Sequence, residues 1–389
     1  MSEKYVQVAV PVPMRQLFTY QVPEEMQTPL IDIGERVAVS FGARQVIAIV
    51  IDIDADIDTV IDDKRTIDRK KIKPISKRLN DSFHLSDSLV SYLKLCANYY
   101  HHPIGDVFQQ ALPKLLRQVK KIELQPPMVW HSAEIIKSEQ KEHLTSVKTK
   151  APKQFSLYQL IAKHQGISWA ELRTLGYSKA QLNALVVKEL IKEIKHKPCQ
   201  FSWQDGDLAQ ENKQVLSTEQ ALIVAAISQS LEQFSCHLID GVTGSGKTEV
   251  YLQAMEKVLA NSQQVLVIVP EIGLTPQTLL RFEQRFNVPI CLHHSNLNDT
   301  ERLDTWLNAQ QGSAAIVIGT RSAIFSPLHQ LGMIIVDEEH DSSLKQQDSF
   351  RYHGRDIAIL RARQLNIPII LGSATPSFES LQNALSGKY

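Results

Sequence analysis

The sequence predicts an α/β protein in which a domain built on a parallel β-sheet follows a small β-rich domain and a helical unit. From Gln214 onward, near-continuous apolar runs alternate with helical stretches, which is typical of a parallel sheet covered on both faces. Short runs with strand-like alternation precede it within residues 6–51, and three short helical patterns lie within residues 153–195. We therefore expect three domains, at residues 1–104, 105–200 and 201–389.

The β-rich domain is predicted from four short runs. Apolar side chains alternate along the first two, in the order Val6, Val8, Val10, then Phe18, Tyr20 and Val22. Two further runs cover residues 36–41 and 45–51 and are joined at Gly42. Short strands at this spacing predict a small β-barrel or sandwich. A helix is expected over residues 85–100, and Pro103 ends it.

Charge and composition narrow the possible environments of the chain. Lys+Arg and Asp+Glu both total 42, so the net charge is zero and a nucleic-acid role has to depend on local patches. An acidic run over residues 52–63 precedes a basic run over 64–78, either as a solvated loop with local pairing or as a nucleic-acid contact. We expect a cytoplasmic protein without a membrane span, because no apolar run is long enough for one. The four cysteines are far apart, which suits neither a disulfide framework nor a zinc site.

The helical unit has the order of a winged helix-turn-helix. Three helical patterns lie between residues 153 and 190, and a β-like tail follows at 191–194. Such units often read DNA, but they also serve as packing modules, and the sequence leaves both interpretations open. The polar, proline-containing segment at 125–152 is expected to be a connector.

A phosphate-binding loop is the most specific motif of the chain. Residues 241–248 match the pattern GxxxxGK[ST] between an expected strand and an expected helix. The residues expected to surround the phosphates of ATP are Gly241, Thr243, Gly244, Ser245, Gly246 and Lys247. Lys247 can reach the β- and γ-phosphates, and the Thr248 hydroxyl can bind Mg²⁺.

A second motif follows an apolar strand and supplies acids. The strand ends in Asp337-Glu338-Glu339-His340. Asp337 would hold Mg²⁺ through its water shell, and Glu338 would orient and polarise the attacking water. Taken alone, the four residues would fit a solvated acidic turn. After a phosphate-binding loop they predict an ATP hydrolase with a RecA-like lobe.

The two motifs together resemble the superfamily 2 helicases, and other segments agree in the same order. Ser373, Ala374 and Thr375 look like the motif that couples ATP hydrolysis to DNA movement. Gln220 occupies the position at which the superfamily reads adenine, and its amide offers a donor and an acceptor to the base edge.

Two further segments resemble the DNA-contacting motifs of this superfamily. Residues 270–277, with Thr275, look like motif Ia, and residues 319–322, with Thr320 and Arg321, look like motif Ib. Both segments place hydroxyl groups, free N–H groups or an arginine at strand ends, where a phosphate backbone can be held.

A loop after the acidic motif resembles one particular family within this superfamily. Residues 341–356 resemble the aromatic-rich loop of the bacterial replication-restart helicases, the primosomal protein N-prime family, which senses single-stranded DNA. The resemblance implies that Phe350 and Tyr352 stack on bases while Arg351 and Arg355 offer charge.

The N-terminal region is similar to the domain with which this family captures the 3′ end of a nascent strand. The resemblance implies that Phe18, Thr19, Tyr20 and Gly34 lie near the terminal nucleotide. Without it, barrel core is the simpler interpretation of the aromatics. Thr19 stands where the family often has an aspartate that accepts a hydrogen bond from the 3′ hydroxyl, so the strength of 3′-end selection stays open.

The resemblance implies an ATP-dependent 3′-to-5′ DNA helicase that recognises stalled or branched forks and promotes replisome reloading. Its expected partners are forked and single-stranded DNA, the single-stranded DNA-binding protein and other primosome proteins, and the chain is expected to be a monomer. The family's zinc-binding insertion and second motor lobe are not found in this sequence, so zinc is expected only in that further part. This chain is then expected to bind ATP and hydrolyse it poorly.

Two alternatives remain. The chain could be a fork-binding platform for partner proteins that does not unwind DNA. A restriction-type translocase on double-stranded DNA shares the motor motifs, but it leaves the N-terminal domain unexplained.

Overall fold

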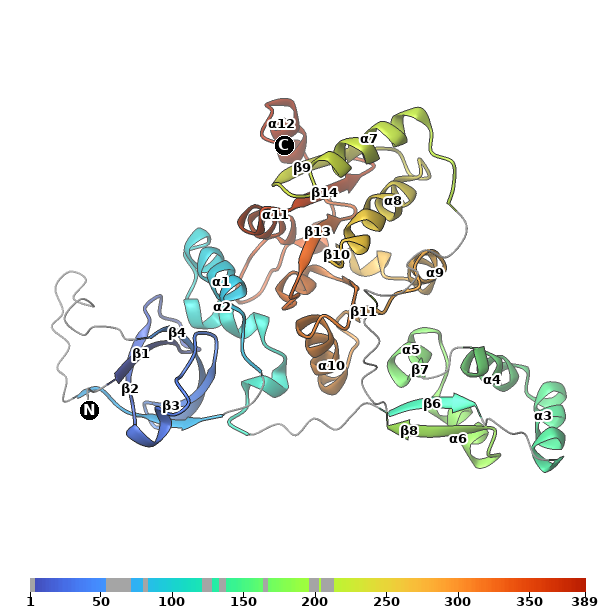
Figure 1. Ribbon diagram of the computed structural model, residues 1–389, viewed down its shortest axis with the longest axis horizontal. Helices are drawn as coiled ribbons and strands as arrows, with labels where there is room; N and C mark the ends of the chain where they lie inside the picture. Colours follow the sequence, from blue (N-terminus) through green and yellow to red (C-terminus); the bar gives the residue numbers. More distant parts are fainter. Residues whose placement is uncertain are drawn as a thin grey trace. The chain divides into compact units, whose positions relative to one another are not determined.

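The computed structural model describes residues 4–53, 71–79, 83–120, 128–132, 138–163, 167–195, 203 and 213–389. The chain forms two compact units, one made of Met1–Ile122 with Trp203–Tyr389 and the other of Glu123–Ser202 (Figure 1). Most of the acidic and basic runs predicted between residues 52 and 78 lie outside the described residues.

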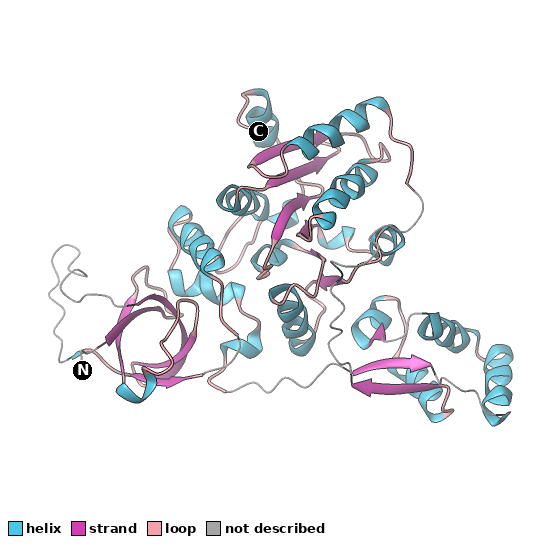
Figure 2. Cartoon of the chain, viewed as in Figure 1, coloured by secondary structure: helices cyan, strands magenta, loops and turns pink. Residues whose placement is uncertain are grey.

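The N-terminal region is an antiparallel sheet that curls strongly (Figure 2). Its strands, in the spatial order β2-β1-β4-β3-β5, are β2 Phe18–Val22, β1 Lys4–Ala9, β4 Arg44–Ile53, β3 Arg36–Phe41 and β5 Ile75–Arg78. The two edges meet, since a bridge pairs Gln21 with Pro74 and the Gln21 N–H donates to the Lys73 carbonyl at 3.0 Å. The predicted small β-barrel is confirmed in this curled form. Alternation along the strands buries one face, including Val6, Val8 and Val22.

Two helices follow the sheet: α1 Asp87–Tyr99, which the sequence predicted, and α2 Ile104–Ala111, which it did not. Pro103 was interpreted as the end of a helix, but proline also precedes or begins helices, and here it caps α2. α2 passes so close to β1 that a Cβ on Gly105 would lie 1.7 Å from the Val10 carbonyl oxygen. Only glycine allows this approach.

The C-terminal lobe is built on six strands, all parallel, in the order β11-β12-β10-β13-β14-β9. Their bounds are β9 Ser235–Asp240, β10 Gln264–Ile268, β11 Ile290–His293, β12 Ile316–Gly319, β13 Leu331–Val336 and β14 Pro368–Ser373. The helices are α7 Thr218–Gln229, α8 Lys247–Ala260, α9 Pro276–Arg285, α10 Asp299–Gln310, α11 Gly354–Leu365 and α12 Phe378–Leu385. The predicted parallel sheet is confirmed. Sequence reasoning missed the edge strand β11, which has only four residues, all half-buried.

Both faces of this sheet are covered, so alternate residues of one strand enter different cores. Val265 and Val267 of β10 pack in a cluster with residues of α8 and α9. Leu266 and Ile268 pack in the other cluster, which also contains buried residues of α1, α2 and α11. The helices after the barrel therefore share a continuous core with the lobe.

Hydrogen bonds strengthen this junction. Tyr92 of α1 donates its hydroxyl to the Ile357 carbonyl at 3.0 Å, and the Trp306 indole N–H donates to the Ala111 carbonyl at 2.9 Å. Both bonds are buried, where an unpaired polar group would be costly. They explain why the barrel region and the lobe form one unit.

The second unit has its own small core. Its elements are β6 Met128–Ser132, α3 Ser138–Lys150, α4 Pro152–Lys163, β7 Ile167–Ser168, α5 Trp169–Thr174, α6 Lys179–Val187 and β8 Ile191–Lys195. The predicted helices and the strand after them are confirmed, and β6 pairs antiparallel with β7 and β8. The predicted connector at 125–152 is wrong, because it contains β6 and α3. α3 is strongly polar, and among its side chains that the structure describes only Leu144 and Val147 join the core, so its apolar pattern was too weak to recognise.

Candidate nucleotide site and DNA-contacting residues

The phosphate-binding loop connects the end of β9 to the start of α8. Gly244 and Gly246 have φ angles of +85° and +83°, a left-handed conformation that glycine adopts at little cost. Gly246 is the N-cap of α8 and has no side chain with which to cap the helix. The backbone N–H groups of the first turn of α8 form the positive end of the helix dipole, where anions bind.

The side chains of the loop fit a magnesium–triphosphate group. Thr243 and Ser245 are exposed, and Lys247 and Thr248 are half-buried at the first turn of α8. The Lys247 amine donates to the Gly241 carbonyl at 2.6 Å, which holds the cation over the loop. A Cβ on Gly241 would lie 2.6 Å from the Ser245 hydroxyl, so glycine keeps this cradle open.

Gln220 lies against the phosphate-binding loop. Its amide oxygen accepts from the Ser217 N–H at 2.9 Å, and its amide nitrogen donates to the Ser245 carbonyl at 2.8 Å. The structure thus brings Gln220 to the nucleotide site. These two bonds leave one hydrogen of the Gln220 amide for a further partner. Recognition of adenine by Gln220 stays a prediction.

Asp337 follows β13 and lies beside α8. Its carboxylate accepts a hydrogen bond of 3.0 Å from the Tyr251 hydroxyl. Burial raises the pKa of Asp337 above its usual range, while the bond from Tyr251 and the charge of Lys247 act in the opposite direction. No role was predicted for Tyr251, although it lies one helical turn after Lys247 on the same helix face.

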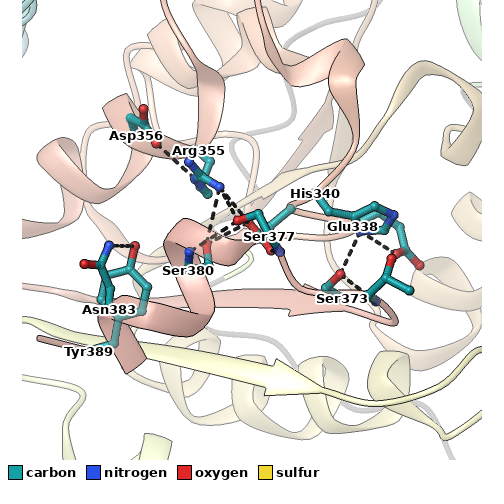
Figure 3. Close-up of polar contacts among 11 residues, drawn as sticks. Glu338, His340, Arg355, Asp356, Ser373, Ser377, Ser380, Asn383 and Tyr389 are labelled. Carbon is teal, nitrogen blue, oxygen red and sulfur yellow. Dashed lines mark hydrogen bonds and ion pairs between the residues drawn. The ribbon is translucent and has the colours of Figure 1, made fainter. Parts of the chain in front are cut away.

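The acid pair is connected to the 373–375 segment. Glu338 has a φ of +47°, which is uncommon for a residue with a side chain. Two residues on, the His340 ring lies 2.7 Å from the Ser373 hydroxyl (Figure 3). Ser373 is fully buried, and the Thr375 N–H donates to its hydroxyl at 3.1 Å, while Ala374 is half-buried. A shift of this segment would therefore reach the turn that carries Glu338.

The residues predicted to hold the DNA backbone differ in accessibility. Thr275 is exposed and caps α9 by accepting from the Thr278 N–H. Thr320 has only 6% of its surface exposed and its N–H donates to the His293 carbonyl at 3.0 Å, and its contact with DNA stays a prediction. Arg321 donates to the Gln346 side chain at 2.7 Å and the Ser343 carbonyl at 2.6 Å, so it supports the loop after the acidic motif.

The aromatic residues of that loop form core. Phe350 and Tyr352 have 0% and 2% of their surfaces exposed, so neither ring can stack on a base as the loop lies. The Phe350 ring packs edge-on against Tyr100 at 5.6 Å and against Tyr352 at 5.0 Å. In this conformation both rings are core, packed against Tyr100 at the end of α1, and base stacking stays a prediction. Arg351 remains exposed.

The barrel residues predicted to lie near a terminal nucleotide also serve the core. Tyr20 is 5% exposed and donates its hydroxyl to the Ser40 carbonyl, so its ring is barrel core and not an accessible contact. Gly34 is buried with a φ of +86°, and a Cβ there would lie 2.0 Å from the Leu85 carbonyl oxygen. Phe18 is half-buried against Phe41, and Thr19 is half-buried on the opposite face of β2. These two remain candidates.

The described residues contain no group of three or more His, Cys, Asp or Glu side chains able to hold a metal ion. No helix in the described part of the chain is long and apolar enough to cross a membrane.

Comparison with protein families gives one match for each half of the larger unit. Residues 7–113 match the 3′DNA-binding domain (3′BD), and residues 217–384 match the DEAD/DEAH box helicase family.

The chain is also similar to curated proteins named replication restart protein PriA. The protein of Haemophilus influenzae is 43% identical over 393 residues, covering 99% of this chain and 51% of that protein. That of Chlamydia trachomatis is 35% identical over 398 residues, covering 99% and 50%. The chain thus spans about half the length of these relatives. A solved structure of RecG bound to a three-way DNA junction has a TM-score of 0.35 at 24% identity, covering 45% of this chain and 23% of that chain.

Proposed function

Because the chain belongs to the PriA family of replication restart proteins and corresponds to their N-terminal half, we propose that it is the fork-recognising and nucleotide-binding part of an ATP-dependent 3′-to-5′ DNA helicase. One observation carries the proposal. A region that matches a 3′DNA-binding domain shares a continuous core with a lobe that has a phosphate-binding loop and an acid pair.

In this proposal the lobe binds ATP with Mg²⁺. Lys247 and the loop amides hold the phosphates, and Thr248 and Asp337 hold the metal ion, Asp337 through water. Bound Mg²⁺ would neutralise charge on the phosphates. Glu338 accepts a proton from the attacking water. Ser373 and Thr375 pass the state of the nucleotide to the DNA-contacting segments through the bond between Ser373 and His340.

The DNA side of the proposal involves both ends of the larger unit. Thr19 and Phe18 of the barrel receive the 3′ end at a stalled or branched fork, and Thr275 and Arg351 meet single-stranded DNA at the lobe. We propose that the protein acts in the bacterial cytoplasm as a monomer, with the single-stranded DNA-binding protein and other primosome proteins as partners.

The test compares nucleotide binding and hydrolysis in two lysine variants of the same helix. We expect Lys247→Ala to weaken binding of a fluorescent ATP analogue by about 10- to 100-fold, because one charged contact to phosphate is lost. Lys257→Ala is the control, since Lys257 is exposed in the last turn of α8.

Single-stranded DNA should raise ATP hydrolysis by the wild-type chain and by Lys257→Ala, but not by Lys247→Ala. Equal nucleotide affinity in both variants would contradict the site. Tight nucleotide binding without any stimulation by DNA would favour the alternative function, a fork-binding platform.

A further inference from the structure

The third acid of the motif has no role in the proposed chemistry, although it is the most buried. Glu339 has 0% of its surface exposed, whereas Asp337 and Glu338 are half-buried. Removing a carboxylate from water is costly unless it is paired and hydrogen-bonded. Such a side chain persists only where the surrounding structure supplies partners.

Four hydrogen bonds satisfy the Glu339 carboxylate. The Arg355 guanidinium donates at 2.9 Å and the Ser380 hydroxyl at 2.8 Å. Ser377 donates twice, from its backbone N–H at 2.7 Å and from its hydroxyl at 3.0 Å. Burial raises the pKa of Glu339, but the bonds from Ser377, Arg355 and Ser380 outweigh burial and lower it below its usual range. Glu339 is therefore an anion at neutral pH.

These donors come from two other motifs or the residues directly after them. Arg355 is the second residue of α11 and lies at the end of the aromatic-rich loop, residues 341–356. Ser377 caps α12, and Ser380 lies in its first turn, directly after the 373–375 segment (Figure 3). The Glu339 backbone N–H also donates to the Gly372 carbonyl at 3.0 Å. One carboxylate thus ties the acidic turn to both segments.

Glu339 directly follows Glu338 in the turn, so the bonds that hold Glu339 also constrain the backbone of Glu338. Glu338, its neighbour, has a left-handed backbone with a φ of +47°. Such a conformation persists in a residue with a side chain when the surrounding structure enforces it. The bonds to Glu339 fix the next peptide on one side, and Asp337 is fixed on the other by β13 and Tyr251.

We propose that Glu339 is a positioning residue for ATP hydrolysis, which holds Glu338 and Asp337 in their working orientation through its bonds to Arg355, Ser377 and Ser380. This inference rests on the proposed function, because it assumes that Asp337 and Glu338 act on ATP. Because Arg355 belongs to α11, a movement of the aromatic-rich loop that displaces α11 would also shift the Glu339 carboxylate.

The test separates nucleotide binding from hydrolysis in Glu339→Gln. We measure affinity for a fluorescent ATP analogue and the single-turnover hydrolysis rate with the protein in excess over ATP. The hydrolysis rate should fall by about 100-fold, the scale of a misplaced catalytic group. Affinity should change by less than about threefold, because the phosphate-binding loop is untouched. Ser380→Ala removes the hydrogen bond donated to Glu339 and the longer one, 3.4 Å, accepted from Arg355, and it should lower the rate by about threefold to tenfold.

The matched control is Glu256→Gln, which disrupts another ion pair of the same lobe. Glu256 lies 2.5 Å from Arg285, which is 4% exposed, and neither residue contacts the acidic turn. We expect Glu256→Gln and Glu339→Gln to lower the unfolding temperature alike, while only Glu339→Gln and Ser380→Ala lower the rate. If Glu339→Gln does not fold, Ser380→Ala decides.

Two results would overturn the positioning role of Glu339 alone, and a third would overturn the proposed function together with it. Wild-type hydrolysis rates in the Glu339 and Ser380 variants would refute the positioning role alone. An equal loss of rate in Glu256→Gln would show that Glu339 matters only for stability. A wild-type chain that neither binds nor hydrolyses ATP would remove the proposed function and this inference together.

Discussion

At the residue scale, burial changes the charge of single side chains in opposite directions. It raises the pKa of Asp337, which delays ionisation of this carboxyl, and it lowers the pKa of His293 to about 4. The Nδ1 atom of His293 is buried and has no hydrogen-bond partner among the described residues. A proton on this ring would be an uncompensated charge, so the folded chain keeps it neutral.

Because the pKa of His293 is lowered in the folded chain, we expect the folded chain to lose stability on mild acidification. Its pKa is about 4 in the folded chain and near 6.5 when unfolded, so the unfolded chain gains the proton first as the pH falls. The stability contribution is complete above pH ~6.5 and is lost towards pH ~4. Between pH 7 and pH 5 we expect a loss of about 2 kcal/mol from this residue.

Urea unfolding at the two pH values measures this effect. His293→Gln should lose that much less stability than the wild type between pH 7 and pH 5, and the exposed His84→Gln should behave as the wild type does. An unchanged pH dependence in His293→Gln would refute the assignment.

The sequence identified the chemistry of single residues better than their accessibility. The phosphate-binding loop and the acid pair follow from spacing, because few other patterns place glycines, a lysine and carboxylates at strand ends. Tyr251, Glu339 and His340 gain their partners through folding, from residues far away in the chain. Tyr20 and Phe350 look alike as aromatic binding residues and as core, and only the fold shows that both are buried.

At the element scale, the aromatic-rich loop is held as part of the core between α1 and α11. Phe350 and Tyr352 pack with Tyr100 and Phe325, and the His353 N–H donates to the Tyr100 hydroxyl at 3.0 Å. These contacts stabilise the junction between the barrel region and the lobe. Arg351 lies between the two buried rings and is exposed.

Substitutions in this loop should therefore separate stability from DNA binding. Phe350→Ala should lower the free energy of unfolding by about 3–5 kcal/mol, as expected for a large ring removed from a core. Arg351→Ala should change it by less than about 0.5 kcal/mol but weaken binding of single-stranded DNA. Thermal unfolding and a DNA titration test both. A stable Phe350→Ala variant that loses DNA binding would restore the base-stacking role.

Elements were predictable where one periodicity dominates. The central strands of the lobe are apolar throughout, and α8 and α9 follow recognisable start signals, so sequence placed them within a few residues. β11 and α3 were missed because each buries only a few side chains. α2 was missed because proline both ends one helix and caps the next.

At the scale of the whole molecule, the barrel region and the lobe form one unit because α1 and α2 lie in one core cluster with the lobe and with the barrel residues Ala9, Ile49 and Ile51. Leu89, Leu93 and Phe108 of these helices lie in one cluster with Ile334 and Leu371 of the lobe. No local pattern in the sequence predicts this continuity, since the partners are more than 200 residues apart. The barrel and the nucleotide site are therefore parts of one compact unit.

The recognition of a 3′ end at a fork is the central claim, and forked-DNA binding tests it most directly. We would measure fluorescence anisotropy with a fork whose 3′ end carries a free hydroxyl, and with the same fork carrying a 3′ phosphate at that end. A phosphate on the other strand is the control. We predict about tenfold tighter binding of the free hydroxyl, the value of one good hydrogen bond at the site of Thr19. Equal affinity for the two forks would contradict 3′-end recognition by the barrel region. The nucleotide-binding helicase lobe would then have no proposed means of recognising a fork.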